Sequence, residues 1–210
     1  MNALRALVML VLALSSPCLA AKFDYDVARQ SVVTIYCDTS KGFGGGVITS
    51  RTTIVTVAHV VNQCSEVRIG YYDHTTAIGK VMEVDSNRDL ARILPERTPD
   101  LINMAELAIE SPVVGETLHT ISHPAGLTWT YTRVHLASDG DTQTDVGDSP
   151  NLTVYVVAGP WAPGFSGGGL FNDDGRVVGL GEGGVKTTSF SFYVPSAQLC
   201  QKLIKCKARS

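Results

Sequence analysis

The chain has 210 residues, of which 44% are hydrophobic and 18% charged, with a formal net charge of −3 at pH 7. This composition supports a folded core and excludes a disordered chain, and the mild acidity gives no electrostatic reason to expect a nucleic-acid partner. The 20 glycines and nine prolines indicate many turns and favour an all-β fold.

The first residues have the order of a secretory signal peptide. Arg5 precedes an uninterrupted apolar run over residues 6–14, and Cys18-Leu19-Ala20 places small residues where signal peptidase cleaves. We therefore predict a signal peptide over 1–20 and a secreted or periplasmic mature chain over 21–210. A membrane anchor is the alternative, but the run has about half of the ~20 residues that a span needs. No stable membrane association is expected after cleavage.

Cleavage would remove one of the five cysteines. A lipid anchor on Cys18 is disfavoured because Pro17 precedes it. An even number of cysteines in an exported chain suggests disulfides, with three possible connectivities. The four that remain are Cys37, Cys64, Cys200 and Cys206. A Cys37–Cys64 bond is favoured because it would fix the segment that follows His59, stabilising the fold by roughly 3 kcal/mol.

The other two cysteines allow a bond only under one condition. In a regular helix Cys200 and Cys206 would lie about 9 Å apart along the axis, beyond the ~7 Å limit for a disulfide. They can pair only if the helix ends before Cys206. A zinc site formed by Cys37, His59 and Cys64 is a further alternative, although the spacing fits no usual ligand pattern.

From about residue 29 the sequence consists of short β-branched and aromatic runs separated by turn residues. The glycine-rich segment Gly42–Gly46 is predicted as a flexible turn. The runs that predict the first group of strands are 31–37, 47–49, 53–57, 67–72, 76–84 and 90–94.

A second group of strands follows a connector with scattered prolines. Residues 139–150 lack an apolar pattern and are predicted as a surface loop. The strands of this group are predicted at 118–121, 128–137, 152–158, 169–171, 177–180 and 189–194. Two groups of about six strands fit two barrels or a sandwich, and strand spacing does not choose between them.

The C-terminal tail has helical character. Ser196 is in a suitable position to cap a helix, and the lysines near the end suit the helix dipole. The apolar residues that would form one face are Leu199, Leu203 and Ile204.

The strongest chemical motif is a serine surrounded by glycines, in the segment Pro163–Gly169. Glycines permit backbone conformations that a Cβ would forbid and let a substrate carbonyl approach the main chain. The N–H groups of Gly164 and Ser166 could then form an oxyanion hole. The alternative is a glycine-rich turn with an incidental serine.

Two further motifs carry a possible base and its partner. His59 directly follows the strand 53–57, and Asp89 opens the apolar run 90–94. Either residue alone has a structural explanation, because a histidine in an apolar run is often a core residue and an aspartate often caps a turn.

Together the three motifs resemble the trypsin-like serine protease superfamily, and within it the bacterial HtrA-like and glutamyl-endopeptidase-like catalytic domains. The order His59, Asp89, Ser166 matches that superfamily, with intervals of 30 and 77 residues. The supporting segments that match are Gly42–Ile48, Asp89-Leu90-Ala91, Ser122–Gly126 and Gly175–Gly184. The resemblance extends over roughly residues 29–195.

This resemblance implies an all-β fold of two six-stranded antiparallel β-barrels with the active site between them and a short C-terminal helix. The N-terminal barrel would cover about 29–100, the connector about 101–115, the C-terminal barrel about 116–195 and the helix about 196–208. Only about 15 residues follow Val194, so no PDZ domain is expected.

The implied activity is that of a serine endopeptidase that hydrolyses peptide bonds through an acyl-enzyme. Ser166 would be the nucleophile, His59 the general base and Asp89 the residue that orients His59. Protein or peptide substrates are expected, with no cofactor, no metal and no nucleic acid, and a monomer is favoured. A catalytically silent binding protein and an esterase of the same fold are the competing functions.

The chain departs from the family beside the serine and in the specificity pocket. Phe165 stands where the family has Asp or Asn, so activation by an ion pair with a new N-terminus is not expected. The implied substrate-binding residues are Pro160, Gly181, Glu182 and Gly183. Pro160 is uncharged and all five histidines precede Ser166, which favours a small or apolar P1 residue. The remaining histidines, expected on the surface or in turns, are His74, His119, His123 and His135.

Overall fold

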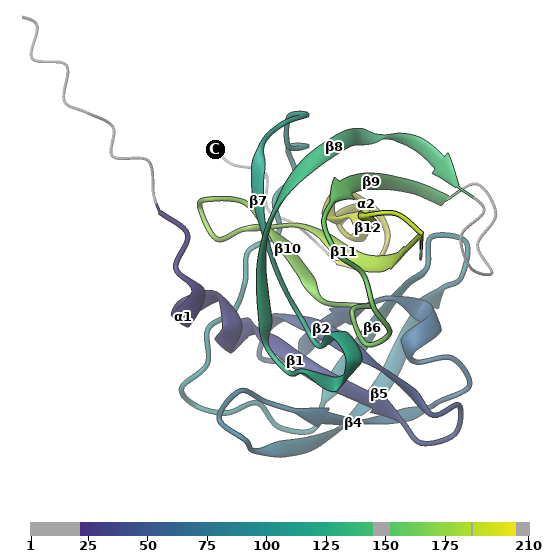
Figure 1. Ribbon diagram of the computed structural model, residues 1–210. Coiled ribbons are helices and arrows are strands. Elements are labelled where there is room, and N and C mark those ends of the chain that lie inside the picture. The colour runs from purple at the N-terminus through teal and green to yellow at the C-terminus, as the bar shows by residue number, and fades with distance from the viewer. Residues whose placement is uncertain (1–21, 145–151, 186, 205–210) are drawn as a thin grey trace, which may run out of the picture.

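The two halves of the chain form two closed β-barrels, one above the other in Figure 1. The structure is a computed structural model that describes residues 22–144, 152–185 and 187–204. The first barrel is built from β1 (Val32–Cys37), β2 (Gly42–Ser50), β3 (Thr53–Thr56), β4 (Glu66–Gly70), β5 (Thr76–Asp85) and β6 (Leu90–Pro95). The second is built from β7 (Thr117–Ser122), β8 (Thr130–Thr144), β9 (Leu152–Ala158), β10 (Gly169–Phe171), β11 (Val177–Gly184) and β12 (Phe190–Pro195).

All strand pairs in the two barrels are antiparallel. The first barrel closes in the order β1-β2-β3-β6-β5-β4 and the second in the order β10-β11-β12-β9-β8-β7. In β4, for example, Val67 and Ile69 point into the core while Glu66 and Arg68 are exposed, which is the two-residue alternation of a half-buried strand. The predicted all-β, two-barrel fold is confirmed, and the sandwich alternative is excluded.

The segment Gly42–Gly46 was wrongly predicted as a flexible turn, because it is the first half of β2. Its glycines serve close packing between the barrels. A Cβ on Gly44 would lie 2.5 Å from the main-chain oxygen of Ser166 and 2.7 Å from the Val60 side chain. The absence of side chains at this place allows the first barrel to approach the serine loop of the second.

β8 is longer than predicted and continues through Thr144, into the segment assigned to a surface loop. Its last residues pair with β9, with Thr142 opposite Val154 and Thr144 opposite Leu152. Main-chain pairing with an apolar strand therefore holds polar residues in β conformation here. The rest of the predicted loop, residues 145–150, lies outside the described residues.

Two short helical segments lie at the ends of the described chain. The helix α1 (Tyr25–Ala28) and the 3-10 turn η1 (Arg29–Ser31) precede β1 and were not predicted. The helix α2 (Ser196–Lys202) begins at Ser196, but its N-cap is Pro195. The predicted capping role of Ser196 was wrong, because its buried hydroxyl donates a hydrogen bond to the carbonyl of Ala108 at 2.6 Å.

The predicted signal peptide, residues 1–20, lies outside the described residues, as do 205–208 of the predicted terminal helix. Within the described part of the chain, no helix combines the length and the apolar character that crossing a membrane requires.

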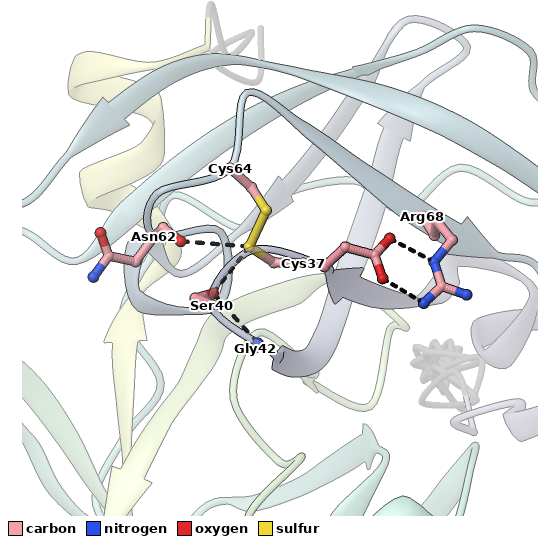
Figure 2. The surroundings of a disulfide bond; sticks show 7 residues. Cys37, Ser40, Gly42, Asn62, Cys64 and Arg68 are labelled. Atoms are coloured by element: carbon pink, nitrogen blue, oxygen red, sulfur yellow. Dashed lines mark hydrogen bonds and ion pairs between the residues drawn. A yellow bond between two sulfur atoms is a disulfide. The ribbon is translucent and has the colours of Figure 1, made fainter.

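A disulfide joins Cys37 at the end of β1 to Cys64 (Figure 2), with 5.9 Å between the Cα atoms. It closes the loop that carries His59, and the Ser40 hydroxyl donates a hydrogen bond to the Cys37 sulfur at 2.9 Å. Because both sulfurs are used in this bond, the alternative zinc site is excluded.

Cys200 lies in α2 and is also disulfide-bonded. The helix ends at Lys202, which meets the condition for pairing with Cys206. Cys206 lies outside the described residues, so this pairing stays a prediction.

Two histidines expected on the surface are buried. His123 is fully buried between the barrels, where its Nε2–H donates to the Val33 carbonyl at 3.0 Å and its Nδ1 accepts the Trp129 N–H at 3.0 Å. His119 is 6% exposed and packs face to face with Phe23, with ring centroids 4.0 Å apart. The prediction was wrong at both positions because partners distant in sequence cover the rings, whereas His74 and His135 are exposed.

Candidate active site

The position of His59 is fixed by a turn at the end of a barrel strand. β3 ends at Thr56, and His59 lies in the 3-10 turn η2 (Ala58–Val60). The side chain of His59 is 43% exposed, whereas that of Asp89 is 7% exposed. The imidazole is therefore open to solvent and its carboxylate partner is buried beneath it.

Asp89 binds the histidine turn at three points. Its Oδ2 lies 2.8 Å from His59 Nδ1, its Oδ1 accepts the His59 main-chain N–H at 2.9 Å, and its own carbonyl accepts the Ala58 N–H at 3.1 Å. Asp89 has φ of 50°, a left-handed conformation that aspartate tolerates better than most residues. This geometry fixes the orientation of the ring and places the Nδ1 proton toward the carboxylate.

Ser166 lies in the loop between β9 and β10, which is anchored on both sides. Its carbonyl accepts the Gly45 N–H of β2 at 2.7 Å, and the Gly167 N–H donates to the carbonyl of Gly181 in β11 at 2.7 Å. The Ser166 hydroxyl donates to the Glu182 carbonyl at 3.1 Å. The serine is thus held at the contact between the two barrels.

The loop exposes two main-chain donors beside the serine. Gly164 has φ of 92° and its Cα packs against the carbonyl of His123 and the ring of Phe43, so a side chain could not be accommodated. Among the described residues, the N–H groups of Gly164 and Ser166 donate to no other protein atom. Such unpaired N–H groups next to a nucleophile can stabilise an oxyanion.

Phe165 holds this loop by apolar packing. The side chain is 2% exposed and meets the ring of Tyr193 edge-on, with centroids 5.1 Å apart. A Cβ on Gly181 would lie 2.7 Å from the Phe165 ring. The family's carboxylate at this position is therefore replaced here by a residue that is buried in the second barrel.

The substrate-binding residues expected from the sequence lie in two places. Gly181, Glu182 and Gly183 are in β11, alongside the serine loop, and all three are buried. Pro160 is exposed and follows the end of β9. The structure thus brings the three β11 residues next to Ser166.

The side chain of Glu182 was not expected beside the histidine. Within the described chain, His59, Asp89 and Glu182 have potential metal-ligand atoms that all lie within 4.8 Å of one another. Burial and, to a smaller extent, the charge of Asp89 raise the pKa of Glu182 to about 7, against the opposing effect of His59. Nothing in the sequence signalled this side-chain orientation, because it depends on a β-bulge in β11.

Comparison with known proteins identifies the family of the chain. The family model of the trypsin-like peptidase domain matches residues 30–180. The chain belongs to this family. Serine protease Do-like HtrA from Bacillus subtilis (strain 168) is 32% identical over 68% of this chain and 34% of that protein. The HtrA-like serine protease of Staphylococcus aureus strain MRSA252 is 26% identical over 85% of this chain and 26% of that protein.

This trypsin-like peptidase chain spans about a third or less of the length of these curated relatives. Solved structures share its fold at lower identity. The Rv3671c protease of M. tuberculosis in an inactive form is 22% identical with a TM-score of 0.75, over 91% of this chain and 96% of that one. The serine endoprotease from Yersinia pestis is 22% identical with a TM-score of 0.72, over 87% of this chain and 67% of that one.

Proposed function

We propose that this chain is a secreted serine endopeptidase that hydrolyses peptide bonds through Ser166, His59 and Asp89. The observation that carries the proposal is the pair of hydrogen bonds between Asp89 and His59, one to the main-chain N–H and one to Nδ1. A carboxylate placed in this way selects the tautomer whose Nε2 can accept a proton. The disulfide and the apolar run at residues 6–14 support secretion.

The mechanism follows from the positions of these groups. The Ser166 hydroxyl rotates away from the Glu182 carbonyl and attacks the substrate carbonyl, while His59 takes its proton. Asp89 stabilises the imidazolium, and the N–H groups of Gly164 and Ser166 stabilise the oxyanion. His59 then gives the proton to the leaving amine, and water hydrolyses the acyl-enzyme.

Substitution of the nucleophile tests the function directly. Ser166→Ala is expected to lower kcat by about 10⁶, since the residues of a triad act as a unit. Purified wild type should react with a fluorophosphonate probe at Ser166, and the variant should not. Hydrolysis of a protein substrate that survives in Ser166→Ala would contradict the assignment, and a wild type that never reacts with the probe would favour a silent binding protein.

The pocket residues support a preference for small or apolar P1 side chains. Gly181 and Gly183 offer no side chain, and Pro160 carries no charge to pair with a basic P1 residue. Cleavage of a peptide library should therefore occur mainly after small or apolar residues. A library profile dominated by Lys, Arg, Asp or Glu at P1 would contradict this preference.

The buried Phe165 supports activity without a further N-terminal cleavage. The oxyanion loop is already held by Phe165 against Tyr193, so no ion pair with a new N-terminus is needed to order it. The mature chain should react with the probe directly after removal of residues 1–20. A mature protein that reacts only after additional proteolysis would contradict this reading.

A further inference from the structure

Glu182 occupies a β-bulge beside the proposed triad. Its neighbours Gly181 and Gly183 face Tyr193 and Phe192 on β12, and Glu182 is the extra residue between them. A bulge re-aims the side chain of the extra residue. Here one carboxyl oxygen comes within 4.8 Å of ligand-capable atoms of His59 and Asp89, while the main-chain carbonyl accepts the Ser166 hydroxyl.

One oxygen of the Glu182 carboxyl is also buried without a donor. The residue is 5% exposed, and its Oε2 has no hydrogen-bond partner among the described residues. Asp89, by contrast, accepts two hydrogen bonds from His59. Ionising a buried carboxyl with an unpaired oxygen is costly, and two adjacent carboxyls disfavour a second negative charge. Glu182 is therefore the carboxyl that carries a proton.

The titratable groups that act on Glu182 come from two other elements. They are His59 on η2 and Asp89 in the turn before β6. The charge around Glu182 in the described chain is therefore set by the His59–Asp89 pair, with which it titrates as a coupled group.

We propose that Glu182 is a positioning residue whose ionisation adds a second negative charge beside His59 and thereby speeds acylation. The inference rests on the proposed function, because it concerns the same base. A negative charge next to the imidazole favours the imidazolium that forms in the transition state. The proton of Glu182 leaves to solvent as the pH rises and is not transferred to the substrate. Burial and the neighbouring Asp89 raise the pKa of Glu182 to about 7, which places this step near neutral pH.

The pH dependence of kcat/KM tests this role. In wild type it should rise in two steps, the second near neutral pH. Glu182→Gln should keep one step and show an alkaline plateau roughly threefold to tenfold lower, as expected for one lost charge at this distance. Glu182→Asp should restore the second step. The control Glu110→Gln removes an exposed carboxylate from the connector and should follow wild type. A Glu182→Gln profile identical to wild type would overturn the proposal.

A second measurement separates this inference from the proposed function. Carbon-13 NMR of the glutamate carboxyls in the Ser166→Ala background should show one group that titrates near neutral pH and that is absent after Glu182→Gln. The His59 imidazole should titrate at lower pH in the Glu182→Gln variant. If wild type fails to hydrolyse peptides, the proposed function falls and these two titrations still decide the placement of the proton. A Glu182 carboxyl that titrates near pH 4, the ordinary range for glutamate, would overturn the proposal.

Discussion

The described part of the chain contains two close histidine–aspartate pairs of opposite construction. His59 and Asp89 are 2.8 Å apart, with an exposed histidine and a buried carboxylate. His119 and Asp173 are 2.7 Å apart, with a histidine side chain that is 7% exposed and a carboxylate that is 62% exposed. The distance between imidazole and carboxylate is therefore nearly the same in the two pairs, and burial is what separates the proposed catalytic pair from the other.

The surroundings of the two imidazoles explain the difference. The His119 Nδ1 bonds the Tyr131 hydroxyl at 2.9 Å, its Nε2 bonds Asp173, and Phe23 covers its face. Both nitrogens are thus used within the second barrel, and the face of the ring packs against the N-terminal segment through Phe23. In the other pair the protein buries the carboxylate and leaves the imidazole exposed to solvent. Burial of the acid rather than of the base is the feature that suits proton transfer.

The largest effect on kcat is expected when the aspartate of each pair is replaced by asparagine and the two variants are compared. Asp89→Asn should lower kcat by about 10⁴, because the amide no longer selects the reactive tautomer of His59. Asp173→Asn should leave kcat within about twofold, because an exposed ion pair contributes little. Steady-state kinetics of both purified variants measures this. Similar losses in the two variants would mean that the His119 pair also serves catalysis.

The sequence order of the motifs was sufficient to predict that His59 and Asp89 lie together, as the structure shows. His59, Asp89 and Ser166 stand beside small residues at strand ends, and the alternating runs predicted most strands within a few residues. The His119–Asp173 pair could not be predicted in this way. The partners are 54 residues apart in the chain, and neither lies in a motif with a chemical meaning.

Other features depended on packing that no local pattern encodes. A glycine run reads as a flexible turn, yet in β2 the glycines make room for Val60 and the Ser166 main chain. Glu182 lies in a strand whose pattern does not reveal a bulge, so its carboxyl beside His59 became visible only in the structure. The burial of His123 likewise results from Val33 and Trp129, which lie on different barrels.

His123 differs from His59 and His119 because it is buried with no carboxylate partner among the described residues. Burial lowers its pKa to about 4, with partial opposition from the Val33 carbonyl. The unfolded chain binds the proton below about pH 6.5 and the folded chain only below about pH 4. Stability is therefore lost as the pH falls through this window, by about 3 kcal/mol.

Denaturation at a series of pH values measures this loss in wild type and in His123→Gln. The glutamine amide can donate to the Val33 carbonyl and accept from the Trp129 N–H but cannot take up a proton. The variant should therefore lose less stability than wild type between pH 6.5 and 4, whatever its stability at pH 7. Parallel curves for the two proteins would show that folding does not lower the pKa of His123. In that case burial without an acid partner would not have suppressed its charge, and the contrast with His59, whose charge Asp89 supports, would lose its physical basis.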